Sequence, residues 1–122
     1  MKYARVYAAP DGESRFDEVE VSLPEVPFVP GQTPIGFAAS IVVTALNFVS
    51  IPGDWEGEWH PTPRRQVWVA LAGEAAVTTS DGEQRRLTAG SVLLLEDLTG
   101  KGHHTRVMGT EPYFGILVAA PG

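Results

Sequence analysis

Short runs rich in Val, Ile, Leu and Thr, each interrupted by Gly, Pro or Asp, recur along this chain. Nowhere do apolar residues recur at a spacing of three to four over a dozen positions, which is the spacing that an amphipathic helix needs. The pattern therefore predicts an all-β protein. The expected strands span residues 2–8, 17–23, 38–49, 66–72, 74–79, 83–87, 91–95, 103–108 and 113–119.

The dipeptide Asp81-Gly82 lies between two of these runs. Tight hairpins favour Asp-Gly because Gly accepts a positive φ without steric cost. We therefore expect a hairpin over residues 74–87.

Residues 24–34 contain four prolines and a glycine among apolar residues. Such a segment can form neither a helix interior nor a central strand, because proline lacks the backbone donor that both require. We expect a loop that crosses the surface or caps an open end of the fold. Phe28, Val29 and Ile35 could fill the mouth of a barrel, but a rigid surface connection is the interpretation we favour.

Length and charge limit the class of protein. A chain of 122 residues is long enough for one domain, which at this size buries about two thirds of the surface of the unfolded chain. The net charge of −6 excludes nucleic acid as an expected partner, because phosphate backbones are bound by an excess of Lys and Arg. The absence of cysteine excludes disulfides and thiolate chemistry.

The first residues, Met-Lys-Tyr-Ala-Arg-Val-Tyr, lack the apolar core of a signal peptide. No run approaches the roughly 20 apolar residues that a membrane span needs. We therefore expect a cytoplasmic protein without a membrane partner.

The spacing of His60, Gln66 and Gly73, and of Gly90 and His103, resembles that of the paired motifs of the conserved-barrel (cupin 2) proteins. The first motif of that family is Gly, five residues, His-any-His, three or four residues, Glu, six residues and Gly. This chain has His60-Pro61-Thr62, then Gln66, then Gly73, so the spacing matches but two ligand types differ. The second motif resembles residues 90–103, with two extra residues before His103.

The resemblance implies a double-stranded β-helix, or jelly-roll, barrel with extra N-terminal strands. We expect a single cupin domain over residues 1–122, with N-terminal strands and the Pro-rich loop in 1–50 and the barrel motifs in 53–119. The segments Pro-Arg-Arg-Gln and Thr-Gly-Lys-Gly-His are also similar to those of a group of small single-domain bacterial cupins.

The resemblance further implies a metal site, since cupins commonly hold Fe, Mn, Ni, Cu or Zn with three His and one Glu. The corresponding positions here are His60, Gln66 and His103, with Thr62 in place of the second His. Loss of the only carboxylate weakens such a site, although a donor could come instead from His104, Glu58 or Glu96. The alternative, in which the two imidazoles are hydrogen-bonded groups lining a pocket, is equally open.

Strand alternation predicts which side chains face the cavity. If Gln66 points inward, Trp68 does so too, and the same parity extends back to Arg64, Thr62 and His60. The wall position of Trp68 would suit ligand stacking, but an ordinary core role is slightly favoured. An inward Arg64 could hold a carboxylate or phosphate, whereas a solvated or ion-paired arginine is the usual outcome.

On the later strand, an inward His103 brings Thr105 with it, whereas an inward His104 would bury Arg106 at a high cost. We therefore place His103 in the cavity. The neighbouring pair Glu96-Asp97 could supply a buried base or simply form salt bridges.

Three functions fit these residues. The first is a metal-dependent dioxygenase, isomerase or lyase acting on a small organic acid. The second is a metal-independent binding module or acid–base isomerase, with His103 and Arg64 as catalytic residues and Trp68, Arg64, Thr62 and Thr105 contacting the small-molecule ligand. The third is a barrel filled by its own side chains. A homodimer is expected in each case, paired through residues 2–8 as an exposed edge strand.

Overall fold

The computed structural model describes residues 1–121 and confirms the all-β prediction. Its strands are β1 (Lys2–Ala8), β2 (Ser14–Glu20), β3 (Glu25–Val26), β4 (Ile35–Gly36), β5 (Ala45–Ile51), β6 (Gln66–Ala72), β7 (Glu74–Thr79), β8 (Gln84–Thr88), β9 (Val92–Glu96), β10 (His103–Val107) and β11 (Tyr113–Ala119). In the described part of the chain, no helix is long and apolar enough to cross a membrane.

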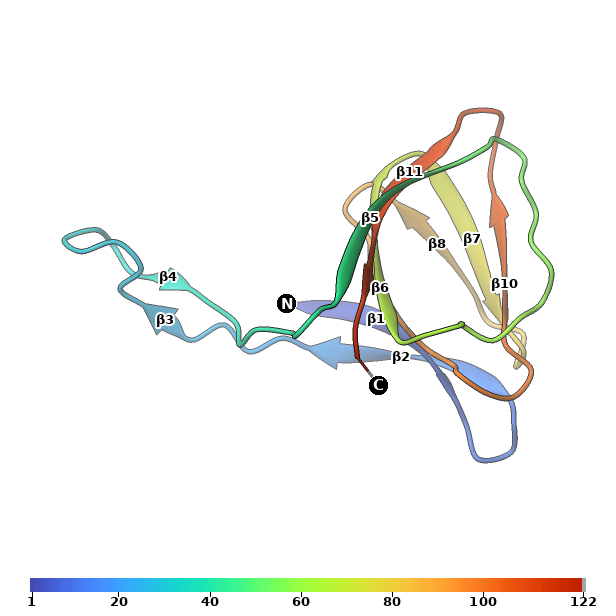
Figure 1. The fold of residues 1–122 in the computed structure, drawn as a ribbon, viewed down its shortest axis with the longest axis horizontal. Helices are drawn as coiled ribbons and strands as arrows, with labels where there is room; N and C mark the ends of the chain where they lie inside the picture. The colour runs from blue at the N-terminus through green and yellow to red at the C-terminus, as the bar shows by residue number, and fades with distance from the viewer. Residues whose placement is uncertain (122) are drawn as a thin grey trace.

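Two sheets form the body of the molecule. A six-stranded sheet has the order β2-β1-β9-β6-β11-β5, and a three-stranded sheet has the order β10-β7-β8. The two sheets face each other across the core (Figure 1). A barrel of this kind leaves one face of each sheet for the interior and the other for the surface.

The interior is built from alternate positions of the strands. On β6, Gln66, Trp68 and Ala70 are buried, whereas Val67 and Val69 are only partly covered. Inward apolar side chains of both sheets form one core cluster, which includes Val6, Phe16, Trp68, Ala70, Ala75, Val77, Leu87, Leu93, Leu95, Val107 and Tyr113. The alternation of period two predicted for β6 is therefore observed.

The predicted hairpin over residues 74–87 is confirmed. Strands β7 and β8 pair antiparallel, with Glu74 opposite Thr88 and Thr78 opposite Gln84. Gly82 has a φ of 95° in the connecting turn, which is the conformation that a residue with a Cβ resists.

The expected strand over residues 17–23 is displaced toward the N-terminus, to Ser14–Glu20, and that over 38–49 is observed only as Ala45–Ile51. Residues 38–44 have apolar and β-branched side chains but belong to no strand, because no neighbouring strand pairs with them. Propensity alone does not make a strand without a partner.

Strand β1 is not an edge strand, so the pairing predicted for residues 2–8 is wrong. It pairs antiparallel with β2 and parallel with β9, which occupies the hydrogen-bonding groups on both of its sides. The edges of the large sheet are β2 and β5.

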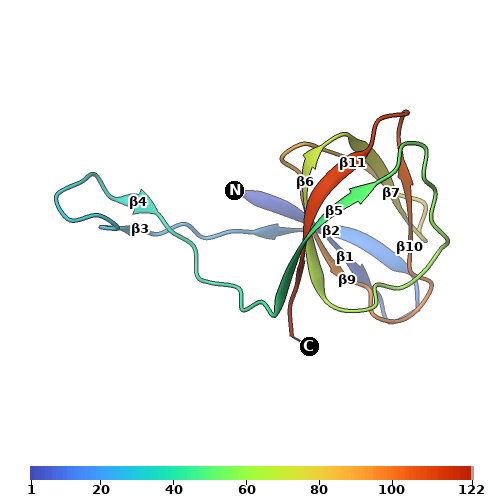
Figure 2. The ribbon, with the colours of Figure 1, turned by 45° about the horizontal axis from the view of Figure 1, so that its top comes forward.

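The Pro-rich segment neither fills the barrel mouth nor lies on the barrel surface. It forms the small β3-β4 hairpin, which projects from the barrel in both views (Figures 1 and 2). Phe28, Val29 and Ile35 are 61%, 49% and 45% exposed, so none of them serves the core.

Candidate functional site

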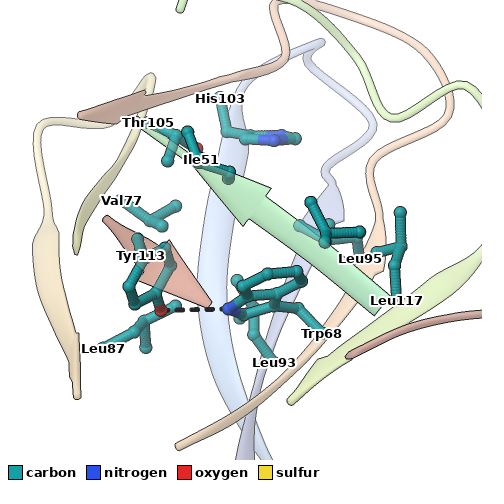
Figure 3. A pocket seen from close by; sticks show the side chains of 11 residues that line it. Ile51, Trp68, Val77, Leu87, Leu93, Leu95, His103, Thr105, Tyr113 and Leu117 are labelled. Atoms are coloured by element: carbon teal, nitrogen blue, oxygen red, sulfur yellow. Dashed lines mark hydrogen bonds between the residues drawn. The ribbon is translucent and has the colours of Figure 1, made fainter. Parts of the chain in front are cut away.

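A cavity of about 160 Å³ lies inside the barrel between the two sheets. Its wall is almost entirely apolar and consists of Val49, Ile51, Trp68, Val77, Leu87, Leu93, Leu95, His103, Thr105, Tyr113 and Leu117 (Figure 3). His103 and Thr105 lie at one end of the cavity, away from the Trp68–Tyr113 pair (Figure 3). The cavity therefore has a polar end and a long apolar wall.

The Trp68–Tyr113 pair closes the apolar end. Trp68 Nε1 donates to the Tyr113 hydroxyl at 2.9 Å, and the rings lie 5.4 Å apart between centroids. Burial raises the pKa of Tyr113, and the hydrogen bond from Trp68 partly offsets this effect. The hydroxyl therefore stays protonated at neutral pH and retains a proton that it can donate.

At the polar end, His103 is paired with a buried carboxylate. His103 Nδ1 lies 2.6 Å from Asp97 Oδ2, and the Asp97 side chain is fully buried. The other oxygen, Oδ1, has no hydrogen-bond partner among residues 1–121. Because a carboxylate accepts, the neutral imidazole paired with it has its proton on Nδ1 and its lone pair on Nε2. This is the arrangement of an oriented proton acceptor.

Two glycines bring this dyad together. Gly102 has a φ of 74°, and a Cβ added there would lie 2.1 Å from the carbonyl carbon of His60. This close approach permits the paired backbone bonds between His60 and His103, at 3.1 and 3.0 Å. Gly100 is equally tight against Gly12, where a Cβ would meet the carbonyl oxygen at 2.4 Å. Backbone packing thus requires the two glycines of the Thr-Gly-Lys-Gly-His segment.

The ligand positions of the first motif, His60, Thr62 and Gln66, lie beside the cavity and not in its wall. Gln66 is buried, and its Nε2 donates to Thr62 Oγ1 at 3.2 Å, while Thr62 Oγ1 donates to the Arg64 carbonyl at 2.7 Å. His60 is exposed, and its Nδ1 lies 2.7 Å from the Glu58 carbonyl oxygen. Its ring centroid is 5.0 Å from that of His103. The structure thus brings the two imidazoles together and turns the amide toward Thr62.

These residues do not make a full metal-ligand set. Residues 1–121 contain no group of three His, Asp or Glu side chains placed to hold a metal ion. His60 and His103 each direct Nδ1 at an oxygen, which leaves two nitrogen donors. Structural and catalytic sites for transition metals use three or more protein ligands. The residues present therefore fit a two-nitrogen contact but not a cupin metal site of three His and one Glu.

The three other donors considered for a metal face elsewhere. Glu96 accepts from Arg65 at 2.6 Å and from Arg5 at 3.2 Å. His104 Nε2 lies 2.9 Å from Glu56 on the outside of the barrel. Glu58 is exposed, and its contact with His60 is made by the backbone carbonyl.

The inward orientation expected for Arg64 is wrong. Its side chain is exposed and forms no part of the cavity wall. Strand β6 begins only at Gln66, so the alternation counted back across Pro61 and Pro63 does not apply to an irregular segment. Of the residues expected to contact a ligand, Trp68 and Thr105 line the cavity, whereas Thr62 and Arg64 do not. His103, expected as a catalytic residue and metal ligand, also lines it.

Two residues of the site were missed as such by the sequence interpretation. Asp97 appeared only as one half of the ambiguous Glu96-Asp97 pair, and Tyr113 was not singled out. Tyr113 begins the strand predicted over residues 113–119, but no signal in the sequence showed that its side chain faces the cavity. No local pattern relates Asp97 to His103.

No protein-family model and no curated protein matches the sequence. Solved structures do resemble it. The Schizosaccharomyces pombe Cnp3 cupin domain aligns with 99% of this chain and 83% of its own, at 17% identity and a TM-score of 0.53. This chain has the cupin fold.

A protein with a double-stranded β-helix domain from Klebsiella pneumoniae aligns with 67% of the chain and 73% of its own, at 24% identity and a TM-score of 0.51. A cupin 2 conserved barrel domain protein from Salinispora arenicola aligns with 63%, at 23% identity and a TM-score of 0.50. The match spans 62% of the length of the Salinispora protein. At these identities the likeness concerns the cupin fold alone.

Proposed function

We propose that this cupin barrel binds a small, mostly apolar organic molecule through one polar group at His103. The observation that carries the proposal is the His103–Asp97 dyad at one end of a cavity whose wall is mostly apolar. Small-molecule sites commonly combine an apolar wall with a few placed polar groups. The dyad provides such a group, because the buried carboxylate fixes the orientation of the imidazole.

Cavity volume limits the size of the ligand. The cavity of about 160 Å³ is smaller than the roughly 300 Å³ at which sites for drug-sized molecules begin. Apolar cavities of about 150 Å³ accept benzene. A ligand of the size of a substituted benzene ring is therefore expected. Because Arg64 lies outside the cavity, a neutral hydroxyl or carbonyl suits this site better than an anionic group.

Proton transfer is a second role, favoured by the same dyad. An imidazole whose Nδ1–H is held by a carboxylate can accept a proton at Nε2 and return it to another atom of the ligand. This is the chemistry of an acid–base isomerase, which needs no metal. We favour it over the metal-dependent enzyme because the donor set has only two nitrogens.

The test compares two probes, phenol and benzene, by calorimetric titration of chelator-treated protein. Wild type should bind phenol more tightly than benzene. The variant Asp97→Asn/His103→Ala should lose about tenfold of the phenol affinity and keep its benzene affinity, since only the hydrogen bond is removed. The matched control is His104→Ala, whose side chain lies on the same strand but outside the cavity.

Each other outcome decides against the proposal. Equal phenol affinity in wild type and the double variant would remove His103 from the binding site. Failure of both probes to bind would favour a barrel filled by its own side chains. If the chelator-treated protein binds phenol only after Zn²⁺ or Fe²⁺ is added, the result would favour the metal-dependent alternative.

A further inference from the structure

The end of the cavity away from His103 carries a second polar group, the hydroxyl of Tyr113. Tyr113 is 2% exposed and lines the cavity, and Figure 3 shows its oxygen beside the indole nitrogen of Trp68. The hydroxyl accepts from Trp68 Nε1 at 2.9 Å, but in the described part of the chain no atom accepts its own proton. A tyrosine hydroxyl can accept and donate at the same time, so its donor is unused.

The surroundings of this hydroxyl offer it no acceptor. Val77, Leu87 and Leu93, which lie around this end of the cavity in Figure 3, present only hydrocarbon. A buried donor without an acceptor lowers stability, and for that reason nearly all buried polar groups have a partner. The unused donor of Tyr113 therefore points to an acceptor that a bound molecule supplies.

Two glycines make room for the Trp68–Tyr113 pair. A Cβ on Gly115 would lie 2.3 Å from the Trp68 ring. A Cβ on Gly73 would lie 3.1 Å from the Cα of Tyr113. The register between β11 and β6 also shifts between Phe114 and Gly115, and such irregularities are frequent beside active sites, where they redirect a side chain. The backbone thus fixes where the hydroxyl meets the cavity.

His103 has the opposite requirement. Because its Nδ1 is held by Asp97, the neutral imidazole has its lone pair at Nε2 and accepts a hydrogen bond there. A ligand group that binds at Nε2 must therefore donate, which a hydroxyl does and a carbonyl does not. The cavity thus has an acceptor, His103, at one end and a donor, Tyr113, at the other.

The two groups lie near opposite ends of β7. His103 pairs with Thr79, the last residue of that strand, whereas Gly73, which adjoins Tyr113, directly precedes the strand. A strand of this length spans about 17–20 Å. Both side chains reach inward from these ends, and Val77 lies between them in Figure 3. One benzene ring with a hydrogen bond of about 2.8 Å at each end suits this arrangement.

We infer that the ligand is a para-disubstituted benzene, which donates a hydroxyl to His103 and accepts from Tyr113 through an oxygen at the opposite end of the ring. This inference rests on the proposed binding at His103 and adds a second anchor to it. A rigid ring holds two groups at opposite ends without the loss of conformational entropy that a flexible chain would suffer. Two anchors of opposite kind also determine which way round the molecule binds.

The test uses calorimetric titration under nitrogen with two probes, hydroquinone and 4-methylphenol. These molecules have the same number of non-hydrogen atoms, but only hydroquinone offers an oxygen to Tyr113. Tyr113→Phe should lower the affinity for hydroquinone about tenfold and leave that for 4-methylphenol within about twofold, because a single hydrogen bond is lost. Tyr7→Phe is the matched control, since it makes the same chemical change outside the cavity wall, and it should alter neither affinity.

A third probe tests the same geometry without any variant. Resorcinol has its two hydroxyls in the meta arrangement, so it cannot reach both anchors along one axis. Wild type should bind resorcinol about tenfold more weakly than hydroquinone. This comparison decides the question even if Tyr113→Phe does not fold.

The outcomes separate this inference from the proposed function. Hydroquinone that binds no more tightly than resorcinol, or that loses no more affinity than 4-methylphenol in Tyr113→Phe, would assign Tyr113 to packing alone and overturn the inference. Binding at His103 would still stand in that case. If 4-methylphenol binds equally well to wild type and to Asp97→Asn/His103→Ala, the proposed function fails, and the inference fails with it.

Discussion

A double-mutant cycle can measure how much the interaction between His103 and Asp97 contributes to the free energy of unfolding. The Asp97 side chain is fully buried, and among residues 1–121 its carboxylate has one hydrogen bond, to His103. The variant His103→Ala leaves that carboxylate in the interior with no partner. A buried acceptor left without its hydrogen bond costs about 1–3 kcal/mol, and more when it is charged, because the remaining carboxylate stays desolvated.

Asp97→Asn should stabilise the His103→Ala variant, although it should destabilise the wild type. The amide keeps the shape of the carboxylate and removes its charge, so the double variant should be more stable than His103→Ala by about 1–3 kcal/mol. In the wild-type background, Asp97→Asn should instead destabilise, since it weakens a charge-assisted bond. The double variant should therefore lose less stability than the sum of the two single variants, by more than about 1 kcal/mol.

Urea unfolding followed by tryptophan fluorescence at neutral pH measures all four free energies of unfolding. Trp68 lies in the core, so its fluorescence changes when the core unfolds. The control His104→Ala should cost less than about 1 kcal/mol, because its contact with Glu56 is on the surface. The reasoning is refuted if His103→Ala costs no more than His104→Ala, or if Asp97→Asn further destabilises the His103→Ala protein.

Two further predictions concern the backbone and the pH dependence of stability. Gly102→Ala should cost more than about 3 kcal/mol, whereas Gly82→Ala, with open space around it, should cost about 1–2 kcal/mol; similar losses in thermal unfolding would contradict the packing argument. The hydrogen bond from Arg5 lowers the pKa of Asp17, so this pair stabilises the fold above about pH 4 and the stability is lost as pH falls through the folded pKa. Because Asp17 is partly exposed, Asp17→Asn should flatten the acid side of the unfolding profile by less than about 1 kcal/mol, and an unchanged profile would assign acid unfolding to other groups.

Local sequence rules worked where the chain is regular. The Asp81-Gly82 turn and the inward positions of Trp68 and Thr105 follow from turn chemistry and strand alternation, and the structure has them as predicted. The same alternation failed for Arg64, which lies before the start of β6. Periodicity describes a strand and says nothing of the irregular segment that leads into it.

The sequence by itself determined an all-β chain, its hairpin and the cupin-like spacing of its two motifs, because these depend on neighbours in the chain. Only the tertiary structure decided that His103 pairs with Asp97, since two glycines with positive φ fold the connecting loop back on itself. It also decided that β1 is an interior strand and that the Pro-rich segment is a projecting arm. Such facts depend on which strands lie side by side, and pairing between distant strands leaves no local trace in the sequence.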